Sequence, residues 1–251
     1  MGIGYTLGCL LSILLWSLKR SAIFSKIEEV GDKYNKIRVL VYLFYLLLLI
    51  MGVWFFINFN NEWTSFLVAF MVIDISNSEK NNINASEIKF HKTIALNCKA
   101  LVSGFIAPLF YILVLGNYMG FIYFTLFNIA LQGNYRKLSY IVNFLTIIPA
   151  FIAQVILYVI ALVLGCKTID FKGDYLENSF RRPFLNLEVI AASIESVSFY
   201  YYFQEDEDGY IKAYGKEKNR ISIKNIVHYT GILYTASFVS YIAFMVICLS
   251  K

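Results

Sequence analysis

Two glutamates seven residues apart, Glu188 and Glu195, could do chemistry because of their type and spacing. Seven residues span about two helical turns, so a helix would carry both carboxyl groups on one face. A carboxyl group in a membrane segment is costly unless it faces a polar interior, where it can transfer protons or hold a cation. The segment 185–203 is therefore either an inward-facing functional helix that crosses the membrane or an amphipathic helix on its surface.

His91 and Cys98 have the same spacing and would also share one helical face. A thiolate beside an imidazole is a workable nucleophile. The pair resembles the histidine and cysteine of the membrane peptidases that trim quorum-sensing peptides, although the lead-in EIKFHK lacks the glycine usual there. The alternative is a surface histidine and a buried cysteine without a chemical role. The four scattered cysteines form no CxxC pair, so we assign no metal site.

Membrane helices are the elements that must position these residues. The 251-residue chain is 59% hydrophobic and 16% charged, whereas soluble domains are about 45–50% apolar and about 25% charged. One crossing of the ~30 Å hydrocarbon layer takes about 20 apolar residues. We therefore predict an all-α fold, a polytopic bundle of about six to seven membrane segments in one integral membrane domain, 1–251, with the lipid bilayer as partner. The expected segments are 5–18, 39–59, 63–75, 101–115, 119–131, 141–164, 185–203 (which either crosses or lies on the surface) and 229–249.

The loops predict the orientation, because lysine and arginine favour cytoplasmic loops. Six of these residues lie in loop 19–38, four in 76–100 and two in 132–140, whereas loop 60–62 and the LGNYMG turn have none. We predict a bacterial or archaeal cell-membrane protein with the three basic loops inside and the N-terminus outside. These loops explain the net charge of +5, so nucleic acid is not an expected partner. The acidic run QEDEDG, 204–209, is expected to be a solvated loop.

The chain has three prolines, each inside or beside an apolar segment. Pro108 stands in GFIAPLFY, Pro149 in NFLTIIPAF and Pro183 in RRPFLNLEVIAASIESV. A proline removes one helical hydrogen bond and clashes with the preceding turn. In lipid the carbonyl that loses its partner must find another. We expect Gly104 and Pro108 to shape their helix and not to take part in chemistry.

The sequence from Gly104 to Ile242, which contains these prolines, can be divided into five blocks. They are GFIAPLFYILVLGNYMGFIYFTLFN (104–128), QGNYRK (132–137), LSYIVNFLTIIPAFIAQVIL (138–157), RPFLNLEVIAASIESV (182–197) and ISIKNIVHYTGILYTASFVSYI (221–242). In this order they resemble the CbiB/CobD family of cobalamin biosynthesis, the adenosylcobinamide-phosphate synthases. The likeness runs from Gly104 to the C-terminus, and its structural motif comprises Gly104, Pro108, Pro149 and Pro183.

The resemblance implies a function. The family joins aminopropanol or its phosphate to a corrinoid carboxylate by ATP-dependent amide formation, so ATP and Mg²⁺ are the implied cofactors and a corrinoid intermediate the implied partner. It also implies that Glu188 is the catalytic carboxyl group, acting on a metal or a proton. The implied substrate contacts are Asn128 and Asn186 together with the phosphate-binding pair Tyr135 and Arg136.

The chain departs from the family at most of its acidic positions. Ser103 stands where the family has an aspartate, Leu131 replaces another, and Val142 and Asn143 replace an Asp-Asp pair. Carboxylates hold the divalent metal against phosphate in such chemistry, so no metal ligand is assigned. Three hypotheses follow: a synthase, a non-catalytic membrane protein of the corrinoid pathway, and the histidine/cysteine membrane peptidase.

Overall fold

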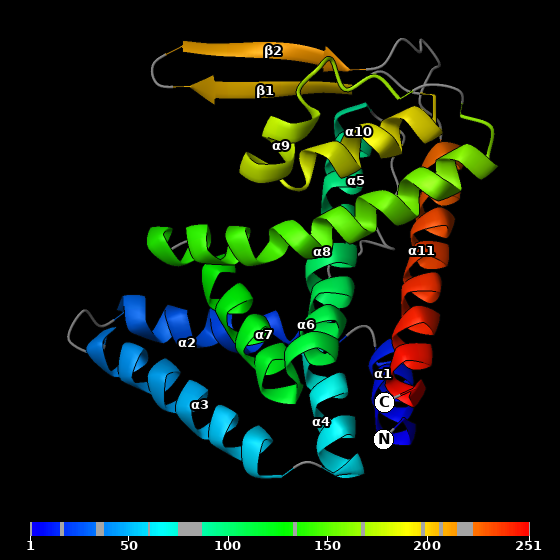
Figure 1. The fold of residues 1–251 in the computed structure, drawn as a ribbon. Coiled ribbons are helices and arrows are strands. Elements are labelled where there is room, and N and C mark those ends of the chain that lie inside the picture. Colours follow the sequence, from blue (N-terminus) through cyan, green and yellow to red (C-terminus); the bar gives the residue numbers. More distant parts are fainter. Residues whose placement is uncertain are drawn as a thin grey trace. The chain divides into compact units, whose positions relative to one another are not determined.

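The structure is a computed structural model that describes residues 2–15, 18–33, 38–59, 61–74, 87–132, 135–166, 169–196, 199–205, 208–214 and 223–250 (Figure 1). The chain packs into two compact units. The first comprises Met1–Asn77, Ala100–Thr146 and Val239–Lys251, and the second comprises Ser78–Lys99 and Ile147–Phe238. Each unit is described by itself.

The first unit is a set of packed helices. They are α1 (Ile3–Leu14), α2 (Ser21–Lys33), α3 (Arg38–Asn58), α4 (Glu62–Val72), the π-helix η2 (Val102–Ile106), α6 (Ala107–Leu115) and α7 (Asn117–Leu131). These helices are apolar except for the charged helix α2. Helix α1 packs against α4 through Gly4 and Gly8. A Cβ atom added at Gly4 would lie 2.1 Å from the Glu62 carbonyl oxygen, and one added at Gly8 would lie 2.5 Å from the Phe66 carbonyl oxygen. Small residues four apart let membrane helices approach in this way.

The break between α6 and α7 confirms the hairpin expected at LGNYMG. Gly116, with φ of +96°, ends α6 and directly precedes α7. This backbone conformation is easy for glycine and strained for other residues. Gly120 then brings the two helices together, because an added Cβ there would lie 2.5 Å from the Ile112 side chain.

Among the described residues, four helices are long and apolar enough to cross a membrane: Arg38–Asn58, Thr93–Leu115, Lys137–Val163 and Val227–Ser250. Many apolar side chains on three of them are exposed at the protein surface, as lipid-facing positions require, whereas Thr93–Leu115 is mostly buried. The chain is thus a helical membrane protein, as expected. The expected segments 5–18, 63–75 and 119–131 coincide with the shorter apolar helices α1, α4 and α7.

Pro108 leaves one backbone carbonyl without its usual helical donor, and another segment supplies a donor in its place. Pro108 cannot donate to the carbonyl of Gly104, four residues earlier, and that stretch is the π-helix η2. The Gly104 oxygen instead accepts a hydrogen bond of 3.0 Å from the backbone N–H of Asp74, just past the end of α4. The proline therefore creates an acceptor that ties α4 to the η2–α6 segment.

Pro149 lies inside helix α8 (Arg136–Val163) and frees the carbonyl of Leu145. The hydroxyl of Tyr111, on α6, donates to this oxygen at 2.7 Å. Tyr111 also stacks on Tyr123 of α7, with ring centroids 5.2 Å apart. A side chain from one helix thus completes the backbone pairing of another, as a non-aqueous setting demands.

Tyr111→Phe removes the only hydroxyl in this contact and leaves the Leu145 carbonyl without its partner. We expect a loss of about 1–3 kcal/mol in unfolding free energy, measured by denaturant titration in micelles. Pro149→Ala supplies a backbone N–H to the same carbonyl, so Tyr111→Phe should cost much less in that background. Tyr140→Phe, at an exposed position of α8, is the matched control. Equal losses in both backgrounds would contradict this pairing.

The second unit holds α5 (Glu87–Leu101) up to Lys99, α8 from Ile147, α9 (Tyr175–Arg181), α10 (Leu185–Ile194), β1 (Phe199–Glu205), β2 (Asp208–Tyr214) and α11 (Ile223–Ser250) up to Phe238. Helix α10 has ten residues, or about 15 Å, and is too short to cross a membrane alone. Glu195 and Ser196 leave the helix, and a strand follows. The expected single segment 185–203 is therefore a short helix and a strand.

The all-α expectation fits the largely helical structure, and the described residues add one two-stranded hairpin, β1–β2. The strands are antiparallel, with Phe199 opposite Tyr214 and Glu205 opposite Asp208. The run QEDEDG, expected to be a loop, contributes strand residues at the tip of this hairpin, where Gln204 pairs with Gly209. The first strand begins with the aromatic run FYYYF. Because aromatic residues favour strands, this run accounts for a strand at the end of the expected segment 185–203.

Candidate functional site

Helix α10 positions Glu188 through an apolar face. Leu185, Val189 and Ala192 pack with Tyr214 of β2 in a core cluster. Glu188 lies to one side of this face and is partly buried. Desolvation by burial raises the pKa of its carboxyl group to about 8. At neutral pH the group is thus largely a neutral acid, able both to donate and to accept a hydrogen bond.

Two buried residues from other helices interact electrostatically with Glu188. The Sγ atom of Cys98, on α5, is 3.0 Å from the hydroxyl of Tyr229, on α11. Glu188 is close enough to interact electrostatically with both. Glu195, which directly follows the last residue of α10, also interacts electrostatically with Tyr229.

Glu195 carries the strongest polar contacts of this group. Its carboxyl group is buried, with Oε1 2.7 Å from Nδ1 of His228 and Oε2 accepting a 3.1 Å hydrogen bond from Nδ2 of Asn225. Both partners come from the first turns of α11. We call the whole group the α10–α11 polar cluster; its members are Cys98, Glu188, Glu195, Asn225, His228 and Tyr229.

Sequence reasoning missed three members of the cluster. Asn225 and His228 are three residues apart and so share a helical face just before an apolar run, a pattern that could have indicated them. Tyr229 left no comparable signal. The partner proposed for Cys98 was His91, whose side chain lies outside the described residues; the observed partner is Tyr229.

Asn186, expected to bind substrate, holds two helices together. Its Nδ2 donates to the Tyr175 carbonyl at 2.9 Å and to the Ser179 hydroxyl at 2.8 Å, both on α9. Two residues along a helix turn through about 200°, so Asn186 points away from Glu188. The structure therefore separates these two expected site residues onto opposite sides of α10.

The remaining expected site residues lie in the first unit. Asn128 is buried and its Nδ2 donates to the Phe124 carbonyl of its own helix at 2.9 Å. The Tyr135 hydroxyl donates to Glu28 at 2.8 Å. Desolvation and this hydrogen bond raise the pKa of Tyr135 above its usual value. A hydroxyl engaged by a carboxylate is not offered to a phosphate in this arrangement. The Arg136 side chain lies outside the described residues.

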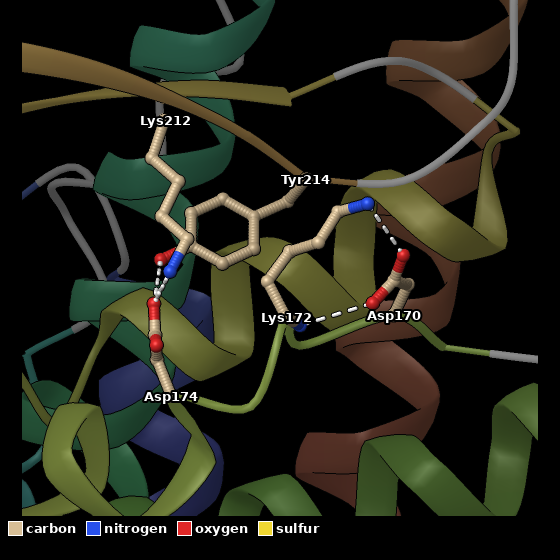
Figure 2. A network of polar contacts seen from close by, with 5 residues as sticks. All are labelled: Asp170, Lys172, Asp174, Lys212 and Tyr214. Atoms are coloured by element: carbon tan, nitrogen blue, oxygen red, sulfur yellow. Dashed lines mark hydrogen bonds and ion pairs between the residues drawn. The ribbon is translucent and has the colours of Figure 1, made fainter.

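A second polar network ties the hairpin to the loop before α9 (Figure 2). Asp174 accepts from Lys212 of β2 and from the Tyr214 hydroxyl, the latter at 3.2 Å. Beside it, Lys172 and Asp170 form an ion pair of 2.8 Å. Because Tyr214 also packs against α10, this network fixes the strand that supports the Glu188 helix.

The described residues contain no group of three or more histidine, cysteine, aspartate or glutamate side chains that could hold a metal ion. The ATP and Mg²⁺ implied by the family resemblance stay a prediction. No protein-family model matches the chain, no curated protein matches it and no solved structure matches it.

The raised pKa of Glu188 predicts how stability depends on pH. The folded carboxyl group holds its proton up to about pH 8, whereas the unfolded one titrates near 4.5. Its contribution to stability is therefore complete below pH 4.5 and is lost as the pH rises to 8. Glu188→Gln should remove this slope and stabilise the protein at pH 8 by about 1–3 kcal/mol, with allowance for partial solvent screening.

The measurement is thermal unfolding in micelles at several pH values between 4.5 and 8. Glu177→Gln, at an exposed position of α9, is the control and should keep the wild-type slope. A wild-type slope that persists in Glu188→Gln would show that another group carries it.

Proposed function

We propose that this chain is a membrane protein of cobalamin biosynthesis, a divergent relative of the CbiB/CobD synthases, and that Glu188 is its acid–base carboxyl group. The observation that carries the proposal is the setting of Glu188. This side chain is partly buried and interacts electrostatically with Cys98 and Tyr229, and it stands at the position that the family resemblance assigns to a catalytic carboxyl group. A carboxyl group desolvated in this way is suited to proton transfer near neutral pH.

In the synthase version of the proposal, Glu188 acts on the amide-forming centre. As a neutral acid it donates a hydrogen bond to an oxygen of the corrinoid carboxylate, where charge develops during attack by an amine. ATP and Mg²⁺ are the cofactors by family resemblance, and they would supply the activation of that carboxylate.

The same observation favours a second candidate, a non-catalytic protein that binds a corrinoid intermediate without converting it. Replacement of the family's aspartate by Ser103 points in this direction as well. The peptidase alternative is disfavoured by Cys98, which is completely buried and has its sulfur against Tyr229. A nucleophilic thiol has to reach its substrate.

Complementation and binding separate these candidates. The gene is expressed in a strain that lacks its own synthase, and completed corrinoid is measured, together with corrinoid binding to the purified protein in nanodiscs. Rescue that Glu188→Gln abolishes and Glu177→Gln preserves supports the synthase. Binding without rescue, weakened at least about tenfold by Glu188→Gln, supports the second candidate. Neither rescue nor binding would refute both.

We also propose that the protein lies in the cell membrane with its N-terminus outside. Hydrogen bonds within the first unit join segments that the pattern of basic loops predicts to lie on the same side of the membrane. On the expected outer side, the backbone N–H of Gly4 donates to Glu62 at 2.7 Å and the Tyr5 hydroxyl to Asn117 at 2.6 Å. These bonds join the N-terminus, loop 60–62 and the turn at 116–118. The Tyr135–Glu28 bond joins loops 132–140 and 19–38, both expected inside.

Labelling of single cysteines in intact cells tests this orientation. In a cysteine-free background, Asn58→Cys should react with a membrane-impermeant maleimide from outside. Lys33→Cys should react only after the membrane is opened. Both positions are exposed in the structure, so access depends on the side of the membrane. The reverse pattern would invert the proposed topology.

A further inference from the structure

Helix α2 is held to the first unit by one of its sides. Its buried residues Phe24, Glu28 and Gly31 are three to four positions apart and therefore line the same face of the helix. The ring of Phe24 packs against those of Tyr45 and Phe124, with centroids 6.1 and 6.0 Å away. The other side of α2 is thus left free to meet the surroundings of the protein.

This free side combines lysines with exposed aliphatic side chains. Lys26 and Lys33 are seven residues apart, and both are exposed. Ile23 and Val30 lie three residues before and four residues after Lys26, so they share its face, and both are also exposed. A helix with lysines and aliphatic residues on its free side is of the type that lies in the membrane interface.

A groove runs between α2 and α3, which lie side by side (Figure 1). It has a volume of about 400 Å³ and is lined by Lys26, Ile27 and Val30 of α2 and by Leu40, Val41 and Phe44 of α3. Of these six, only Val41 is buried, and a Cβ atom added at Gly31 would lie 3.0 Å from its Cγ2 atom. The groove is therefore open to the outside and apolar except for Lys26.

The groove lies at the depth where lipid headgroups meet acyl chains. Helix α3 is long and apolar enough to cross a membrane, and most of its side chains are exposed. It begins at the charged residue Arg38, and Leu40 and Phe44 follow within about 9 Å along its axis. Basic residues at the end of a spanning helix lie at the membrane interface. Because Lys26 lines the same groove, its ammonium group lies near the headgroups.

The charges around the groove favour an anion. Segment 19–38 contains six basic residues and only three acidic ones, Glu28, Glu29 and Asp32. Glu28 is buried and accepts a hydrogen bond from Tyr135. Asp32 lies 3.9 Å from Arg38. Within the part of the chain that the structure describes, Lys26 has no ion-pair partner, so its charge is available to a phosphate group.

We propose that the groove between α2 and α3 binds one anionic phospholipid. The lipid phosphate pairs with the ammonium group of Lys26, and one acyl chain lies along Val30, Leu40 and Phe44. The lipid thereby holds the interfacial helix α2 against the spanning helix α3. This inference goes beyond the proposed function and does not depend on it.

Native mass spectrometry of the whole chain, released from micelles with added lipid, tests the headgroup contact. The probes are phosphatidylglycerol, which is anionic, and phosphatidylcholine with the same acyl chains, which has no net charge. We expect the wild-type protein to bind one phosphatidylglycerol about fivefold more tightly than phosphatidylcholine. Lys26→Ala should abolish this preference. Lys137→Ala, at an exposed position where another spanning helix begins, is the matched control and should keep it.

Two results would overturn the headgroup contact: equal binding of both lipids by the wild-type protein, or an equal loss in Lys26→Ala and Lys137→Ala. Inorganic phosphate in excess, which has the charge without the chain, should not displace phosphatidylglycerol. Displacement by phosphate would assign the groove to a free anion and contradict a lipid site.

The acyl-chain contact is tested by a second pair of variants in the same measurement. Leu40→Gln should weaken the binding of both lipids at least about threefold, because it removes apolar surface from the groove. Val39→Gln is the matched control, since Val39 is 62% exposed and Leu40 59%, but only Leu40 lines the groove. Equal effects of the two substitutions would show that the chain does not lie in this groove.

Discussion

A proline inside a helix leaves one backbone carbonyl without its helical hydrogen-bond donor. That carbonyl must find another donor within the protein, because lipid offers none. Two such carbonyls organise the first unit: that of Gly104 receives the backbone N–H of Asp74, and that of Leu145 receives the Tyr111 hydroxyl. In the second unit, the carbonyl of Pro183 itself accepts from Gln154 of α8 at 3.3 Å. The prolines thus mark points where one element is tied to the next.

In the second unit, side-chain polar contacts hold the hairpin in place beside α10. The hairpin strand β2 is held to the loop before α9 by Asp174, and its Tyr214 packs against α10. At the end of α10, Glu195 contacts His228 and Asn225 of α11, and Glu188 interacts electrostatically with Tyr229 of the same helix. A short helix pinned on one side in this way can hold carboxyl groups at a fixed place, as chemistry requires. The arrangement makes the α10–α11 polar cluster the natural place to look for function.

The sequence indicated much of this architecture. Hydropathy located the long helices, and Gly116 fell at the expected turn. The need of the proline-freed carbonyls for partners was also predictable. Their identity was not, because Asp74 and Tyr111 are each at least 30 residues away along the chain and are brought near only by packing.

The strand after α10 and the cluster partners could not be predicted for similar reasons. In FYYYF every residue is aromatic, so neither the helical nor the strand period is visible. Cys98 meets Tyr229 across 131 residues of sequence, and no local pattern connects them. Asn186 lies two residues before Glu188 in the sequence, but its side chain hydrogen-bonds to the backbone of α9.

The central claim is that Glu188 is a neutral acid turned inward at physiological pH. Infrared spectroscopy of the protein in lipid at pH 6.5 tests it directly, because a protonated carboxyl group has a C=O stretch distinct from that of a carboxylate. The account predicts a protonated-acid band that disappears in Glu188→Gln and remains in Glu177→Gln. A spectrum without that band, or with one that Glu188→Gln leaves unchanged, would contradict it.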